Sequence, residues 1–159
     1  MDIVLNGEKT TYEDIVKVAR HGAKLCFSDD ADKRIKRCQE MIEELVENGE
    51  KIYGVFLTRE QGLELQKKII FSHSASFGDE LPPEEVRAAM ASRASVWTKG
   101  HSGLRLSTAR TYIDMVNKGV VPIVYEKGSV GCSGDLSPLS QIAEVVLGEG
   151  KAYYRGEKL

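Results

Sequence analysis

The sequence predicts a mainly α-helical protein that folds as a single domain over residues 1–159. In six segments, apolar residues recur at the three- and four-residue spacing of amphipathic helices. Gly, Pro or Asn residues separate most of these segments, as expected where helices begin and end. A chain of 159 residues is also long enough to bury one sizeable core. Short β segments are expected only near the N-terminus and after the last helix.

The first elements are a short strand and a helix. Residues 2–5 are expected to form the strand, which a turn at Asn6-Gly7 ends. Thr10-x-x-Glu13 has the form of a capping box, so a helix is expected to begin there and to end near Gly22. The residues expected to face inward from this helix are Tyr12, Ile15, Val16 and Ala19.

Four further helices are expected in the middle of the chain, each bounded by residues that start or stop helices. They run from about Ser28 to Asn48, from Thr58 toward His73, from Pro82 to Gly100 or Gly103, and from about Leu104 to Lys118. The apolar residues expected to be buried in the second and third helices of the chain are Ile35, Cys38, Met41, Ile42, Leu45, Val46, Leu63, Leu65, Ile69 and Ile70. Those expected in the fourth are Val86, Ala89, Met90 and Trp97.

Residues 128–141 read Gly-Ser-Val-Gly-Cys-Ser-Gly-Asp-Leu-Ser-Pro-Leu-Ser-Gln. One interpretation is a glycine-rich turn before a sixth helix over residues 138–147, with Ser137 as N-cap and Pro138 as the first helical residue. The N-terminus of that helix would offer unpaired N–H groups and a positive dipole end beside the turn. After the helix, residues 151–155 are expected to form a strand that the chain ends too soon to pair.

The core of this run, Cys132-Ser133-Gly134-Asp135, favours a reaction of the backbone with itself. Because Gly134 has no side chain, its amide nitrogen can approach the Cys132 carbonyl in conformations that other residues avoid. Ring closure with loss of one water, followed by loss of the Ser133 hydroxyl as a second water, leaves an exocyclic methylidene. Unmodified amino acids contain no such electrophile.

Two other interpretations of the run are weaker. Gly128, Gly131 and Gly134 have a spacing that suggests a phosphate-binding loop, but the run lacks the G-x-G opening of a dinucleotide loop and the Lys of a P-loop. A serine-hydrolase elbow requires G-x-S-x-G, whereas Ser133 is followed directly by Gly134.

The run resembles the histidine and aromatic amino-acid ammonia-lyase family. In that family a methylidene-imidazolone (MIO) prosthetic group arises from Ala-Ser-Gly within Gly-Ser-Val-Gly-Ala-Ser-Gly-Asp-Leu-Ala-Pro-Leu. The resemblance spans nearly the whole chain, and it implies the helical fold of the N-terminal part of a histidine ammonia-lyase. It also implies that Cys132, Ser133 and Gly134 form MIO and that no external cofactor is needed. Cys132 replaces the usual Ala, a difference that ring closure tolerates because only the carbonyl of this residue takes part.

The resemblance assigns two further site residues. Tyr53 is implied to be the base that removes the β-proton of the substrate; the alternative is a half-buried Tyr with its hydroxyl at the surface. The family's Tyr-Gly-x-x-Thr-Gly-Phe-Gly segment is abbreviated after Tyr53, so this loop is either shortened or lacks residues that the complete protein has. His73, in Phe-Ser-His-Ser-Ala, is implied to bind the substrate side chain, and it would suit histidine or tyrosine better than phenylalanine. The equally weighted alternative is that His73 interacts only with the last carbonyls of its own helix.

The reaction implied by the resemblance is non-oxidative deamination of an L-amino acid, with histidine to urocanate favoured and tyrosine possible. Lys99-Gly100-His101-Ser102-Gly103 instead resembles aromatic lyases and 2,3-aminomutases, so an aminomutase that uses the same group is an alternative. The family's enzymes are longer and tetrameric, which implies that this chain is the N-terminal, MIO-bearing portion of a longer lyase. Its partners would be further copies in a homo-oligomer or a complementary C-terminal chain. A catalytically incomplete helical fragment or assembly partner is the third alternative.

Composition favours chemistry on a small metabolite. The net charge is −2 with both signs interspersed, which does not suggest a nucleic-acid or membrane partner. The start of the chain lacks the basic and apolar segments of a signal peptide, so a cytoplasmic location is expected. Three widely spaced cysteines are expected to stay reduced, and the three histidines share no ligand spacing with them, so no metal site is expected.

Overall fold

Six helices dominate the part of the chain that the structure describes, which comprises residues 2–50, 59–131 and 134–159. They are α1 (Tyr12–His21), α2 (Asp29–Glu47), α3 (Arg59–His73), α4 (Pro83–Trp97), α5 (Leu106–Lys118) and α6 (Leu136–Val146). The short strands are β1 (Asp2–Leu5), β2 (Lys24–Phe27), β3 (Phe77–Glu80), β4 (Val121–Pro122), β5 (Tyr125–Lys127), β6 (Ala152–Tyr154) and β7 (Glu157–Lys158). This computed structural model therefore confirms the mainly α fold.

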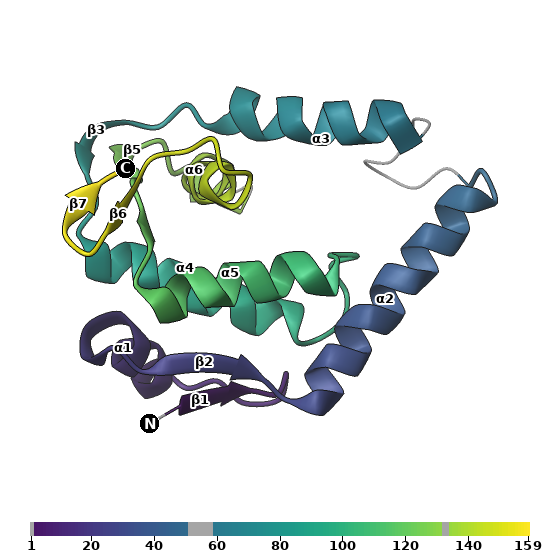
Figure 1. Cartoon of the computed structure of the whole chain (residues 1–159), viewed down its shortest axis with the longest axis horizontal. Coiled ribbons are helices and arrows are strands. Elements are labelled where there is room, and N and C mark those ends of the chain that lie inside the picture. Colours follow the sequence, from purple (N-terminus) through teal and green to yellow (C-terminus); the bar gives the residue numbers. More distant parts are fainter. Residues whose placement is uncertain (1, 51–58, 132–133) are drawn as a thin grey trace.

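The helices stack in layers (Figure 1). α4 and α5 pack against each other in the middle layer, with α1, β1 and β2 on one side and α6 on the other. α3 packs against α6 from the far side, so α6 lies between α3 and the middle layer. Fully buried side chains fill the space between these layers; the largest include Leu5, Val18, Val86, Met90, Val116 and Ile142. The hydrogen bond between Ser76 and Ser137 places the N-terminal turn of α6 beside the segment that follows α3.

Three small sheets join segments that are distant in the sequence. β1 and β2 form a parallel pair in which Ile3 lies opposite Leu25, and β3 pairs with β5 in antiparallel orientation. The strands β2, β3, β4, β5 and β7 were not expected, because each has only two to four residues and too short a pattern to stand out. The prediction that the C-terminal strand has no partner is wrong. β6 pairs with β4 from earlier in the chain and, through a tight turn, with β7.

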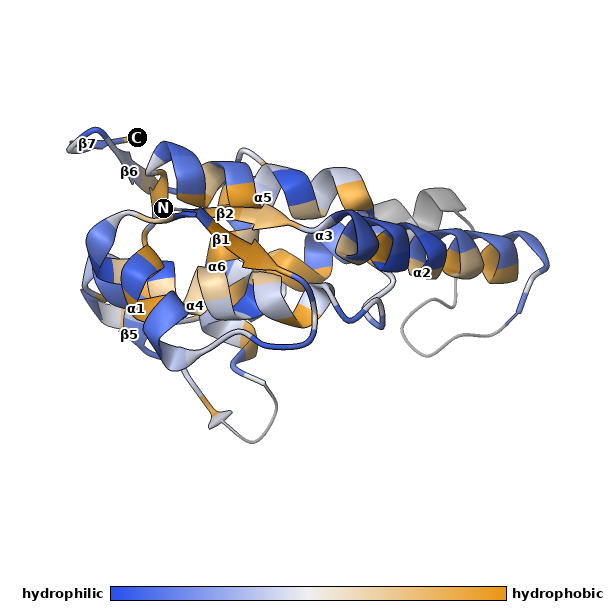
Figure 2. Ribbon diagram, turned by 90° about the horizontal axis from the view of Figure 1, so that it is seen from below, coloured by the Kyte–Doolittle hydropathy of each residue, from blue (hydrophilic) through white to orange (hydrophobic). Residues whose placement is uncertain are grey.

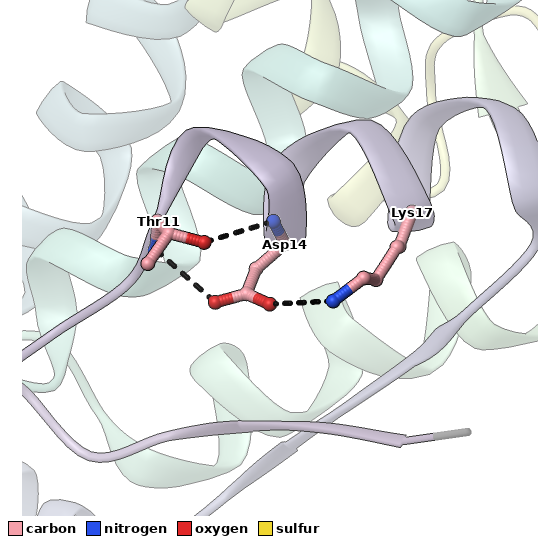
Figure 3. Close-up of polar contacts among 3 residues, drawn as sticks. All are labelled: Thr11, Asp14 and Lys17. Atoms are coloured by element: carbon pink, nitrogen blue, oxygen red, sulfur yellow. Dashed lines mark hydrogen bonds and ion pairs between the residues drawn. The ribbon is translucent and has the colours of Figure 1, made fainter.

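The capping box of α1 lies one residue later than predicted. Thr11 is the N-cap: its hydroxyl accepts a hydrogen bond from the Asp14 N–H at 3.2 Å, and its own N–H donates to the Asp14 carboxylate at 3.2 Å (Figure 3). These bonds and Lys17 Nζ, 3.3 Å from the carboxylate, lower the pKa of Asp14, with the Thr11 N–H as the largest cause. Thr10 instead shares a hydrogen bond with Ser95. At the first helical position Tyr12 is 79% exposed, so its predicted inward orientation is wrong.

Three other residues predicted to be buried are exposed, and one of them, Ile69 in α3, is 41% exposed. α2 begins with Ser28 as its N-cap, as expected, but its buried residues lie only in its first half, and Met41 is 50% exposed. Figure 2 shows apolar residues continuing along the protruding half of α2. In α4 the buried stripe proceeds in steps of four through Val86, Met90 and Ala94, which leaves Ala89 on the exposed side.

Arg87 joins three helices around the core. From α4 its guanidinium donates to the carbonyl of Val18 at 2.8 and 3.2 Å and to the carbonyl of Val116 at 3.2 Å. These carbonyls lie in the last turns of α1 and α5, where a positive charge complements the helix dipole. Burial lowers the pKa of Arg87 from its usual value.

We expect Arg87→Met to lower the free energy of unfolding by about 2–3 kcal/mol, because two partly buried carbonyls lose charged donors while the aliphatic volume is kept. The measurement is a denaturant titration of the full-length protein. Arg93→Met is the matched control, since Arg93 is an exposed arginine on the same helix. Equal unfolding midpoints for the two variants would contradict this role for Arg87.

Candidate active site

The predicted reactive turn connects β5 to α6. Cys132 and Ser133, together with Tyr53, lie outside the described residues, whereas Gly134 is described. Gly134 has φ +84°, in the left-handed region that favours glycine, and no atom would contact a Cβ placed there within 4 Å. The backbone conformation, not crowding, therefore calls for glycine at this position. Asp135 follows with φ +55°, so two successive left-handed residues turn the chain into α6.

α6 begins two residues earlier than predicted. Asp135 is its N-cap, so the assignments of Ser137 as N-cap and Pro138 as the first helical residue are wrong. The side chain of Asp135 makes no capping bond but accepts a hydrogen bond from the hydroxyl of Ser129, across the turn. An Asp can adopt the left-handed conformation more readily than most residues, which explains why it occupies this junction.

Ser76, Ser137 and Gln141 form a polar cluster at the base of the turn, which we name the buried clasp. Ser76 and Ser137 share a hydrogen bond between hydroxyl oxygens 2.6 Å apart. Gln141 donates to the carbonyl of Ser76 at 3.2 Å and accepts from the N–H of Tyr125 at 3.0 Å. The clasp thus connects the segment before β3, the strand β5 and the first turns of α6.

His73 is the last residue of α3. Its Nδ1 lies 2.8 Å from the carbonyl oxygen of Ile69 and 3.0 Å from the hydroxyl of Ser72. Because a carbonyl oxygen only accepts, Nδ1 carries the proton, and Nε2 of the neutral ring is an acceptor. The contact with the helix carbonyl that one interpretation predicted is therefore present.

The described site residues come from two segments that meet. Three residues after His73, Ser76 contacts Ser137, which follows the triad by three positions. The structure thus brings the end of α3 against the flank of the reactive turn, as Figure 1 shows for α3 and α6. A shallow groove of about 380 Å³ lies elsewhere, between β2 and α5, and includes none of the predicted site residues.

The Lys99–Gly103 segment contacts α2. A Cβ on Gly100 would lie 2.8 Å from the backbone oxygen of Arg34, and the N–H of Gly103 donates to Cys38 Sγ at 3.2 Å. Close packing against α2 accounts for glycine at positions 100 and 103, so no contact with a substrate is needed to explain these residues.

Three features concern metal, redox and membrane chemistry. Within residues 2–50, 59–131 and 134–159, no cluster of three His, Cys, Asp or Glu side chains is placed to hold a metal ion. Cys26 and Cys38 are free thiols, and burial, with a smaller effect of Asp2, raises the pKa of Cys26. Among the described helices, none combines the length and apolar character needed to cross a bilayer.

Sequence reasoning missed Ser76, Ser129 and Gln141 as residues of the site. A signal for Gln141 was present, since it lies four residues after Ser137 and beside the buried Ile142, where a polar side chain needs a partner. Ser76 carried no such signal, because its partners depend on how distant segments pack, and Ser129 bonds a residue only six positions away, across the turn.

Comparisons with known proteins agree with the motif. A sequence model of the family described as aromatic amino acid lyase matches residues 10–159. A histidine ammonia-lyase from Caldanaerobacter subterraneus subsp. tengcongensis is 43% identical over 167 residues, which cover 99% of this chain and 33% of that protein. One from Treponema denticola is 42% identical, over 98% of this chain and 32% of its own length. The chain thus spans about a third of the length of these relatives.

Solved structures show the same fold. The crystal structure of histidine ammonia-lyase from Trypanosoma cruzi matches with a TM-score of 0.93 and 36% identity, over 100% of this chain and 32% of that one. Tyrosine aminomutase from Streptomyces globisporus matches with a TM-score of 0.91 and 28% identity, over 100% and 32%. This part of the fold is therefore common to lyases and aminomutases.

Proposed function

Because the chain belongs to the aromatic amino acid lyase family, we propose that it is the N-terminal, ring-bearing part of an ammonia-lyase that deaminates an L-amino acid without oxidation. Histidine, with urocanate as product, is the favoured substrate. The observation that carries this choice is the 43% identity to a histidine ammonia-lyase across 99% of the chain. The proposed location is the cytoplasm.

Cys132, Ser133 and Gly134 would form the MIO group of this enzyme. The described part of the turn fits such a group, because Gly134 has a conformation reserved for glycine and open space where a side chain would be. When present, MIO supplies an electrophilic methylidene carbon that accepts electron density from the substrate. The N-terminus of α6 supports this chemistry, since its positive dipole end polarises carbonyl groups beside it.

Two side chains of this chain would handle the substrate. Tyr53 removes the β-proton as a general base. Nε2 of His73, left as an acceptor by the bond from Nδ1 to Ile69, accepts a hydrogen bond from an imidazole N–H or a phenol O–H. No external cofactor takes part in this scheme.

The remainder of the site would come from outside this chain. Further copies in a homo-oligomer, a tetramer by resemblance, or a complementary C-terminal chain would supply it, and alone this chain would be a catalytically incomplete fragment. The alignment with the Caldanaerobacter enzyme is longer than the chain itself, so that relative has residues here without a counterpart. We place this difference after Tyr53, where the sequence abbreviates the family segment.

An aminomutase is the second candidate, because a tyrosine aminomutase shares this part of the fold at a TM-score of 0.91. It would return ammonia to the β-carbon instead of releasing it. The deciding experiment offers L-histidine, L-tyrosine and L-phenylalanine to the full-length protein and analyses products by absorbance and mass spectrometry. Urocanate and free ammonia support the lyase, a β-amino acid supports the aminomutase, and turnover of none of the three contradicts both.

His73→Leu is expected to lower kcat/KM for the preferred substrate about five- to thirtyfold, because one hydrogen bond to the substrate side chain is lost. The effect should fall mainly on KM. His101→Leu is the matched control, since His101 is an exposed histidine that packing does not connect to the turn. The assignment of His73 fails if the two variants show the same kinetics.

A further inference from the structure

The buried clasp holds both ends of the reactive turn. Ser76 and Gln141 are only 8% and 7% exposed, so their polar atoms depend on protein partners. Ser76 lies before β3, whereas Ser137 and Gln141 belong to α6, and the paired residues are 61 and 65 positions apart in the sequence. Such contacts limit how far the segments on either side of the turn can separate.

Gln141 fixes the strand that leads into the turn. Its amide is satisfied on both sides, by the N–H of Tyr125 in β5 and by the carbonyl of Ser76. These two partners also determine the orientation of the amide, because one only donates and the other only accepts. An apolar residue at position 141 would leave two backbone groups unpaired at a site that is otherwise closed to solvent.

Ser76 fixes the two ends of the turn against each other. On one side its hydroxyl is bonded to Ser137, at 2.6 Å. On the other side Gly128 lies so close that a Cβ there would overlap Ser76 Oγ and lie 2.8 Å from Ser76 Cα. One residue therefore contacts the start and the end of the segment 128–137 that contains the triad.

We propose that the buried clasp positions the turn for ring formation, with Ser76, Ser137 and Gln141 as positioning residues. This inference rests on the proposed function. Holding the ends of a short loop together removes most of its conformational freedom before reaction, which raises the effective concentration of the reacting groups. The groups that must meet are the nitrogen of Gly134 and the carbonyl carbon of Cys132.

The reaction that the clasp assists balances without a co-reactant. The Gly134 nitrogen forms a bond to the Cys132 carbonyl carbon, and the carbonyl oxygen leaves as water with the protons of the Gly134 and Ser133 N–H groups. A double bond between that carbon and the Ser133 nitrogen results. The second water takes the Ser133 hydroxyl and the α-proton of Ser133, and it leaves the exocyclic double bond. No oxidation or reduction occurs.

The test follows ring formation itself. Full-length protein is made by cell-free synthesis, and samples taken over time are digested with trypsin, which releases residues 128–151 as one peptide. The loss of two waters from this peptide measures the reaction independently of activity. We expect Ser137→Ala to slow the loss about five- to tenfold and Gln141→Leu to slow it at least as much, whereas Ser137→Thr, which keeps the hydroxyl, stays within about twofold of the parent.

A core variant separates positioning from general stability. Val18→Ala removes buried volume in α1, away from the clasp, and its melting temperature is compared with that of Ser137→Ala. If Ser137→Ala slows the loss of the two waters and an equally or less stable Val18→Ala does not, the role of the clasp is supported. If both variants slow the loss equally, or if Ser137→Ala does not slow it, the proposal is overturned. If Gln141→Leu does not fold, the two Ser137 variants decide. If the parent protein never loses the two waters, the proposed function is contradicted. Failure of the proposed function is therefore distinguishable from failure of the clasp proposal.

Discussion

Ser133→Ala is expected to abolish turnover and the loss of two waters together. Without the hydroxyl there is no second water to lose, so the exocyclic methylidene does not form. The variant peptide 128–151 should lose at most one water, from ring closure alone. Activity of the full-length protein should fall by at least about a thousandfold, because the substrate amine then lacks the electrophile on which the proposed reaction depends.

Ser140→Ala is the control for this experiment. Ser140 lies in the same tryptic peptide but in the middle of α6, beyond the residues of the turn. It should retain both the mass loss and the activity of the parent. Unchanged turnover by Ser133→Ala would rule out the proposed mechanism, whatever the mass of the peptide.

Tyr53→Phe has the second-largest expected effect: kcat should fall about 10²- to 10⁴-fold, the usual range for removal of a general base or acid. The peptide 128–151 should nevertheless lose both waters at the rate of the parent, since the phenol takes no part in ring formation. This combination distinguishes a residue that acts on the substrate from one that prepares the electrophile. The measurements are single-turnover kinetics and the mass of the peptide.

Tyr12→Phe is the matched control, because Tyr12 is 79% exposed on α1 and should tolerate loss of its hydroxyl. A substrate deuterated at the β-carbon adds a second test. If Tyr53 removes that proton, the isotope effect should increase in Tyr53→Phe as proton removal becomes slower than the other steps. Full activity of Tyr53→Phe would contradict the role of Tyr53 as the base. It would support the alternative of a half-buried tyrosine with its hydroxyl at the surface.

Several features of the fold were predictable from short stretches of sequence. Helical periodicity, proline at the start of α4 and glycine after α1 and α5 act within one or two turns of a helix, and the structure confirms the helices that they predict. The errors arose where two neighbouring residues could serve equally well. Thr10 and Thr11 both suit an N-cap, and with Thr11 as the cap Tyr12 becomes the first helical residue, where it is 79% exposed.

The start of α6 was misjudged for a different reason. Ser137-Pro138 is a favourable helix start when only local rules are considered. In the structure, however, the Ser137 hydroxyl bonds Ser76, which is 61 residues away in the sequence, and Asp135 takes the cap position in a left-handed conformation. A tertiary contact therefore outweighs the local preference at the residues that adjoin the triad.

The sequence by itself determined the helical fold class and the family and predicted the triad at residues 132–134, because each depends on residue types within a short run or at helical spacing. Only the tertiary structure decided which residues support the turn: Ser76, Ser137, Gln141 and the bond from Ser129 to Asp135. The physical reason is that buried polar groups take whichever partners the packing of α3, α6 and β5 brings within hydrogen-bond distance. Ser76 is 61 and 65 residues from its partners Ser137 and Gln141, so no local pattern specifies these contacts.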